Sequence, residues 1–194
     1  MLANQINQGD HVAFFFKTKE EQLGTVIPFI AIGLEKNEQC LYIADANTPA
    51  EIRQQLQAYG VDVEAAKKSG ALSIVTKHET YLRHGSFEPH KMIIDLCSAV
   101  DDSVDDSVAA GFDGLRAAGE LSWALDLPSA LAQLVEYEER LDSYFYERFT
   151  ALCQYDEARF PGALVERMKQ LHPVVIADGK LRRKSLMTAS KIAV

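Results

Sequence analysis

The sequence lacks the glycine-rich loops with which many proteins hold nucleotide phosphates. No Gly-Lys-Ser or Gly-Lys-Thr follows the first apolar run, residues 11–16, and no G-x-G-x-x-G occurs in the chain. The residues after that run include Glu20 and Glu21, whose charges would repel a phosphate. A G-x-S-x-G nucleophile elbow is missing as well. These absences argue against ATP hydrolysis, dinucleotide-dependent hydride transfer and α/β-hydrolase chemistry, and we predict that the protein is not an enzyme.

Cysteine is scarce, and its spacing does not suggest a metal site. The three cysteines, Cys40, Cys97 and Cys153, lie far apart, and each has apolar neighbours. Structural zinc sites usually show paired ligands about two to five residues apart, a spacing that this chain does not offer. His11 and His172 are equally isolated. We therefore predict no metal and no cofactor, and we expect buried thiols in a reducing cytosol.

Positive charge and long apolar runs are also in short supply. The chain carries 20 Lys and Arg against 28 Asp and Glu, which gives a net charge of -8. Such a balance argues against general binding to nucleic acid or to anionic lipid. No segment approaches the roughly 18 consecutive apolar residues of a membrane span, and no basic segment followed by an apolar run opens the sequence. The expected location is the cytoplasm, away from membranes.

No linker rich in proline, glycine or serine divides the 194 residues, so one domain is the simplest organisation. We assign residues 1–179 to that domain and residues 180–194 to a basic C-terminal tail, which would permit a short amphipathic helix. The four-residue repeat at 101–108 predicts a solvated amphipathic helix, with its valines along one face.

Six short apolar runs, rich in aromatic and β-branched residues, predict six buried strands. They cover residues 11–16, 39–45, 71–76, 114–119, 149–155 and 173–178. Helical patterns alternate with these runs, and the clearest is the apolar face that repeats from Leu23 to Leu34. The alternation predicts a three-layer α/β fold, with a mostly parallel sheet of about six strands and helices on both faces.

A second helix can be placed from its ends. Thr48 followed by Pro49 and Glu51 is a capping-box sequence, and Gly60 is a typical residue after the last turn. We therefore predict a helix between Thr48 and Gly60.

Polar and aromatic residues follow the apolar parts of two predicted strands. They are Glu120, Trp123, Tyr155, Asp156 and Arg159. Ligands of parallel α/β sheets collect at the carboxyl ends of the strands, so these residues predict a site.

Two of these side chains have alternative interpretations. Glu120 could accept a hydrogen bond from a ligand, or it could form a structural ion pair with Arg116 or Arg159. Trp123, the only tryptophan, and Tyr155 could form the walls of an apolar pocket, or they could simply belong to the core.

Taken in order, several segments resemble the sensory domain family named MEDS, found in methanogens, methylotrophs and regulators of the dichloromethane type. The likeness covers about residues 10–179. It rests on residues 11–16, 26–30 with 33–34, 40–45, 79–82 with 85–89, 119–124, 137–141, 151–156 and 172–173.

This resemblance implies a RecA/KaiC-like fold without the phosphate loop, which senses simple hydrocarbon derivatives or other small organic molecules. It also implies a set of site residues, because eight positions match the motifs of the family. They are His11, Cys40, Tyr42, Glu120, Trp123, Cys153, Tyr155 and His172.

The sequence thus favours a stand-alone cytosolic sensory domain that binds a small organic ligand. No kinase or helix-turn-helix segment follows the tail in this sequence, so we expect the signal to pass to a separate protein, such as a kinase or regulator, with a homodimer as a further arrangement. The alternatives are a degenerate RecA-like enzyme that uses Glu120, or an interaction scaffold without a ligand.

Overall fold

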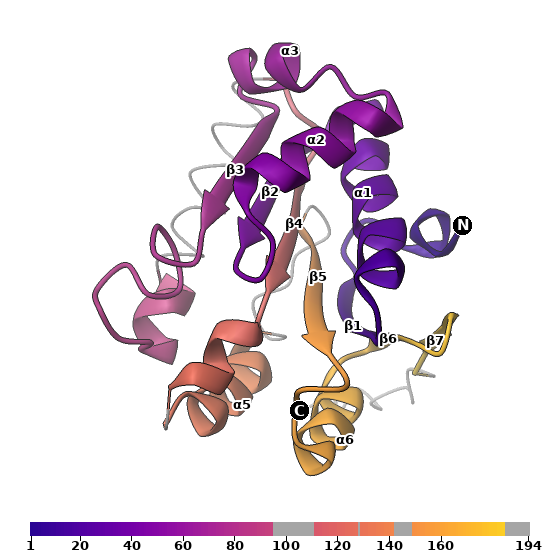
Figure 1. Cartoon of the computed structure of the whole chain (residues 1–194). Coiled ribbons are helices and arrows are strands. Elements are labelled where there is room, and N and C mark those ends of the chain that lie inside the picture. The colour runs from indigo at the N-terminus through magenta and orange to yellow at the C-terminus, as the bar shows by residue number, and fades with distance from the viewer. Residues whose placement is uncertain (95–110, 128, 142–148, 185–194) are drawn as a thin grey trace, which may run out of the picture.

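The computed structural model describes residues 1–94, 111–127, 129–141 and 149–184 (Figure 1). Seven strands form one sheet in the order β3-β2-β4-β5-β1-β6-β7. The strands are β1 His11–Phe16, β2 Gln39–Ala44, β3 Leu72–Thr76, β4 Leu115–Glu120, β5 Phe149–Asp156, β6 Val174–Ala177 and β7 Lys180–Arg183. The first six run parallel, and β7 pairs antiparallel with β6. The predicted mostly parallel α/β sheet is confirmed, with one strand more than expected.

Helices lie on both faces of the sheet (Figure 1). They are α1 Lys19–Glu35, α2 Pro49–Tyr59, α3 Val63–Lys68, α5 Ala130–Leu141 and α6 Gly162–Leu171, together with the 3-10 turns η1 Leu2–Gln5 and η2 Ser122–Asp126. Apolar residues of α1, α2 and α3 share one core with the even-numbered residues of β1 and β5, and α5 and α6 share the other core with the odd-numbered residues. We call these the α1 face and the α5 face.

The helix predicted from its capping residues has the expected ends. The Thr48 side chain accepts a hydrogen bond from the backbone N–H of Glu51, and the Glu51 carboxylate accepts one from the backbone N–H of Thr48. Pro49 begins the helix, and Gly60 follows it in the left-handed region at φ 106. No helix among the described residues has both the length and the apolar character needed to cross a bilayer.

The segment expected to be a tail begins as a strand. Residues 180–183 form β7 rather than the short helix that their basic and apolar residues permitted. Asp178 and Gly179 make the two-residue turn before it, with φ 51 and φ 66. Two successive residues with positive φ match the twist of a hairpin, so the chain turns directly from β6 into β7. The remainder of the expected tail, 185–194, and the repeat at 101–108 lie outside the described residues.

A close approach of helix α1 to the sheet depends on a glycine. A Cβ atom added to Gly33 would lie 2.6 Å from Arg116 Cδ, 2.6 Å from Cys40 Sγ and 2.8 Å from Arg116 Nε. The Arg116 side chain is fully buried here, where it forms an ion pair with Glu38 and lies 4.6 Å over the ring of Phe29. Since the Arg116 stem and the thiol are both buried, neither can move away easily.

We expect Gly33→Ala to lower the free energy of unfolding by about 1–3 kcal/mol, because the added methyl group overpacks this contact. Gly24→Ala in the same helix is the matched control. Nothing lies within 4 Å of a Cβ atom at Gly24, so this change should raise stability by up to about 1 kcal/mol through helix propensity. Urea denaturation of both variants measures the difference, and equal effects would contradict the packing argument.

Candidate functional site

The carboxylate of Glu120 is the centre of a buried polar cluster on the α1 face. Its Oε1 accepts hydrogen bonds from the Tyr42 hydroxyl at 2.6 Å and from Asn47 Nδ2 at 3.0 Å. Its Oε2 accepts from three consecutive backbone N–H groups, those of Asp45 at 3.2 Å, Ala46 at 2.6 Å and Asn47 at 3.0 Å. This one side chain therefore holds the loop after β2 against the end of β4.

Two glutamines extend this cluster across the sheet. Gln22 of α1 donates from Nε2 to Gln154 of β5 at 2.9 Å, and its Oε1 accepts from Asn47 at 3.0 Å. Burial, with the nearby Glu120 charge, raises the pKa of Tyr42 well above its ordinary value, so its hydroxyl stays a donor. The cluster joins the carboxyl ends of β2, β4 and β5, as expected for a sheet of parallel strands.

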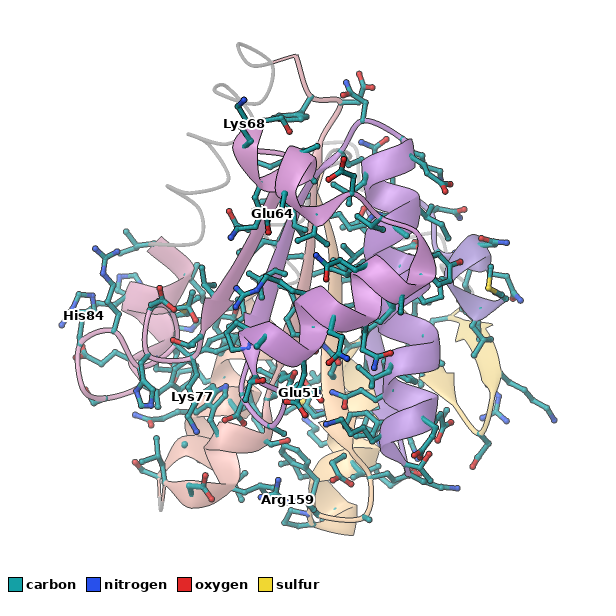
Figure 2. All side chains as sticks on the ribbon, turned by 45° about the horizontal axis from the view of Figure 1, so that its top comes forward. Glu51, Glu64, Lys68, Lys77, His84 and Arg159 are labelled. Atoms are coloured by element: carbon teal, nitrogen blue, oxygen red, sulfur yellow. The ribbon has the colours of Figure 1, made fainter. Side chains whose placement is uncertain are left out.

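The structure tests the structural ion pair that the sequence suggested for Glu120. Among the described residues, no ion pair joins Glu120 to Arg116 or to Arg159, so the ion pair considered from the sequence is wrong. Arg116 is paired with Glu38, and Arg159 is exposed at the edge of the molecule (Figure 2). The carboxylate is instead stabilised by five hydrogen bonds from uncharged groups of the protein.

A second buried cluster lies on the α5 face, around Glu138 of α5. Glu138 Oε2 lies 3.2 Å from His11 Nε2, 3.3 Å from His172 Nε2 and 3.8 Å from Cys153 Sγ. Cys153 Sγ lies 3.6 Å from His11 Nε2. The Tyr155 hydroxyl donates to the other oxygen, Glu138 Oε1, at 2.8 Å. We call His11, Glu138, Cys153 and His172 the four-donor cluster.

Burial and the charges of neighbouring residues together set the acid–base properties of this cluster. Burial lowers the pKa of His172, and the neighbouring His11 lowers it further. Burial raises the pKa of the Cys153 thiol, as does the adjacent Glu138 carboxylate. For Glu138 itself, burial raises the pKa, but the two imidazoles lower it by more, so this pKa lies below its ordinary value. The carboxylate is therefore ionised at neutral pH.

Four of the eight predicted site residues thus meet in one place, namely His11, Cys153, Tyr155 and His172. The sequence analysis gave no role to Glu138, the residue that joins them. A signal for it was available, because Glu138 lies on the apolar face of α5. The buried residues of this helix are Ala130, Leu134, Tyr137, Glu138 and Leu141. A carboxylate on such a face requires partners in the interior.

Trp123 lies in an aromatic group beside the four-donor cluster. Its ring stacks on Tyr81 with centroids 5.1 Å apart, and it contacts Phe87 at 4.6 Å. Phe87 in turn packs edge-on against Tyr137 of α5 at 5.6 Å. Tyr155 packs against other rings, those of Phe15 in β1 and of Phe160 before α6. Trp123 and Tyr155 thus have separate aromatic partners.

The Tyr81 side chain connects the aromatic group to the four-donor cluster. A Cβ atom on Gly119 would meet the Tyr81 hydroxyl, so this hydroxyl lies directly against β4. Gly119 is paired with Cys153 in the sheet, and burial together with the charges near Cys153 and Glu138 raises the pKa of Tyr81 well above its ordinary value. The aromatic group and the four-donor cluster therefore form one continuous region beneath α5.

Cys40 lies apart from the other predicted residues. It is buried at the start of β2, where its Sγ lies 3.6 Å from the carbonyl oxygens of Ile30 and Glu38. Burial raises the pKa of this thiol to about 12, against an opposing effect of Arg116. Cys40 is thus a protonated core residue on the α1 face.

An acidic side chain lies where the phosphate loop of a nucleotide-binding protein would hold its anion. The backbone N–H of Lys17 donates to the carboxylate of Glu21 at 2.9 Å, and Thr18 caps α1 through the backbone N–H of Glu21. An anion at this helix N-terminus is therefore supplied by the protein itself.

Comparison with known proteins places this chain in a family. Residues 10–173 match the family MEDS, described as the MEthanogen/methylotroph, DcmR Sensory domain. Among curated proteins, the transcriptional repressor DcmR of Methylorubrum extorquens is 24% identical over 149 residues, which are 76% of this chain and 52% of the repressor. The chain spans about half the length of the curated relative it matches.

Solved structures share the fold. A KaiC-like protein of the hyperthermophilic archaeon Pyrococcus horikoshii has a TM-score of 0.59 at 16% identity, covering 87% of this chain and 70% of that one. An uncharacterized protein of Pyrococcus horikoshii, crystallised in complex with an unknown peptide, has a TM-score of 0.65 at 14% identity, covering 92% and 83%. The predicted KaiC-like fold is confirmed.

We expect Glu120→Gln to lower the free energy of unfolding by about 2 kcal/mol, because an amide N–H₂ group would face hydrogen-bond donors in a buried place. Glu35→Gln, which changes an exposed carboxylate at the end of α1, should change stability by no more than about 0.5 kcal/mol. Chemical denaturation of both variants tests this. Equal stabilities for the two would show that Glu120 does not anchor the loop at 45–47.

Proposed function

The chain belongs to the MEDS family of sensory domains, and on that premise we propose that it binds a small organic molecule beneath α5 and passes the signal to a separate protein. The proposal places the ligand beside Trp123, in the aromatic group that includes Tyr81, Phe87 and Tyr137.

The observation that carries this proposal is the indole N–H of Trp123. The Trp123 side chain is 0% exposed, and its Nε1 has no hydrogen-bond partner among the described residues. A buried donor without an acceptor costs about 1–3 kcal/mol, so most native proteins avoid it. A ligand with an acceptor oxygen would satisfy this donor, while its carbon atoms would contact the surrounding rings.

The rings of the aromatic group come from different elements of the fold, so a bound ligand could change how these elements pack. Tyr137 belongs to α5, whereas Trp123 belongs to η2 after β4, so a molecule between their rings would bear on both elements. A ligand moves such an equilibrium only through its different affinities for two arrangements. The displacement of α5 relative to the sheet is the change that we propose as the signal.

The similarity to a repressor supports a regulatory output for the signal. The matched region of the DcmR repressor is about half of that protein, so the sensory part of such regulators is one portion of a longer chain. We propose that here the receiver is a separate kinase or regulator, or a second copy of this chain. Native mass spectrometry of the purified protein measures directly whether two copies of the chain form a complex.

The alternatives receive less support from the geometry. In the enzyme hypothesis Glu120 acts as a base, but both of its oxygens already accept hydrogen bonds from five donors. A scaffold without a ligand would leave the Trp123 donor unpaired. A failure to find a bound ligand would therefore favour the enzyme or the scaffold hypothesis.

Trp123 is the only tryptophan, so its fluorescence tests binding without a label. We expect at least one of methanol, ethanol, dimethyl ether and acetate to change the emission saturably. Trp123→Phe keeps an aromatic ring but removes the N–H donor, and it should bind the same probe at least about fivefold more weakly by calorimetry, the effect of one lost hydrogen bond.

Tyr59→Phe is the control for that experiment, because Tyr59 is an exposed aromatic residue on the opposite face of the sheet. Its affinity for the probe should equal that of the unchanged protein. Absence of saturable binding by every probe, or unchanged affinity in a folded Trp123→Phe variant, would contradict the proposed site.

A further inference from the structure

The four-donor cluster has the composition of a metal site. His11 comes from β1, Cys153 from β5, Glu138 from α5 and His172 from the residue before β6. One ligand atom of each residue lies within 4.8 Å of those of the others, and all four residues are buried. Two imidazole nitrogens, one sulfur and one carboxylate oxygen are the donor types found in protein zinc sites.

Four of the six distances between these donors match the edges of a tetrahedron around one ion, and the other two lie within 4.8 Å. With Zn–N and Zn–O bonds of about 2.0–2.1 Å, nitrogen and oxygen ligands lie about 3.3 Å apart, and a Zn–S bond of about 2.3 Å puts sulfur about 3.6 Å from them. The observed separations from Glu138 Oε2 to the two imidazoles are 3.2 and 3.3 Å. Those from Cys153 Sγ are 3.6 Å to His11 and 3.8 Å to Glu138.

The tautomer of His172 leaves a lone pair directed into the cluster. His172 Nδ1 lies 2.9 Å from the carbonyl oxygen of Met168, so Nδ1 carries the proton and donates it. In the neutral imidazole Nε2 is then an acceptor. The His172 side chain is 0% exposed, and Nε2 has no hydrogen-bond partner among the described residues. It faces Glu138 Oε2 at 3.3 Å, and two lone-pair atoms at that distance repel unless a proton or a metal cation lies between them.

The neighbours of the ligands are also those of a metal site. Histidine ligands usually donate their second N–H to a carbonyl or carboxylate, as His172 does to Met168. Ligating carboxylates are usually hydrogen-bonded in turn, and the Tyr155 hydroxyl donates to Glu138 Oε1 at 2.8 Å, which leaves Oε2 for the ion.

From this geometry we propose that His11, Glu138, Cys153 and His172 bind one zinc ion with all four of its ligands supplied by the protein. Calcium and magnesium require oxygen ligands and do not fit a thiol with two imidazoles. Because no coordination position is left open, the ion is structural. Since Glu138 is the ligand from α5, the ion fastens this helix to the sheet. Binding of zinc does not depend on the proposed sensing of an organic molecule.

Cobalt(II) is the probe for this site, because tetrahedral cobalt absorbs in the visible range and a bound thiolate adds a charge-transfer band in the near ultraviolet. We expect the chelator-treated chain to bind one cobalt ion with both features, and zinc to displace it. Native mass spectrometry should find one zinc ion per chain after purification without chelator.

Two variants locate the ligands. Cys153→Ser should abolish the charge-transfer band, whereas a variant with both other cysteines changed, Cys40→Ser with Cys97→Ser, should keep it. If Cys153→Ser fails to fold, Tyr155→Phe replaces it as the test. This variant removes only the hydrogen bond to Glu138, and it should weaken zinc binding about 10- to 100-fold.

The proposal is overturned if the folded chain binds neither cobalt nor zinc, since the cluster then holds protons rather than a metal. It is also overturned if the charge-transfer band survives in a folded Cys153→Ser variant, or if zinc affinity is unchanged in Tyr155→Phe. None of these measurements involves an organic ligand, so this proposal and the proposed sensing function can fail separately.

Discussion

The alternation of side chains along β5 is the constraint on which both polar clusters depend. Successive residues of a strand point to opposite faces of the sheet, so Gln154 points to the α1 face while Cys153 and Tyr155 point to the α5 face. Gln154 there joins the Glu120 cluster, and Cys153 joins the four-donor cluster. A shift of β5 by one residue would exchange the two faces and dismantle both clusters, so the buried polar groups help to fix the register of the central strands.

The six predicted strands and the helix α2 could be predicted because each has a local signal. The strands are short apolar runs, and α2 is defined by Thr48 at its start and Gly60 at its end. The missed strand β7 had a signal too. Asp178-Gly179 is a favoured two-residue hairpin turn, but the basic residues of β7 suggested a solvated tail. Exposed edge strands often carry such charges, so the composition was consistent with either structure.

The candidate site could be predicted only in part, because its partners are far apart in the sequence. The sequence placed Glu120 at the end of β4, but nothing local indicated that the N–H groups of residues 45–47 would donate hydrogen bonds to it. Likewise His11 and Cys153 are separated by 142 residues. The rule that metal ligands lie in closely spaced pairs describes small zinc modules, whereas a parallel sheet brings single residues together from successive strands.

The two regions beneath α5 share adjacent residues of that helix. Tyr137 packs against Phe87 beside Trp123, and Glu138 enters the four-donor cluster. Neighbouring helical positions move together, so a ligand that displaced Tyr137 would also change the distance from Glu138 to His11 and His172. An ion held at those three residues would resist such a displacement, and a protonated cluster would resist it less. The occupancy of the four-donor cluster would therefore set how strongly a molecule beside Trp123 must bind before α5 moves.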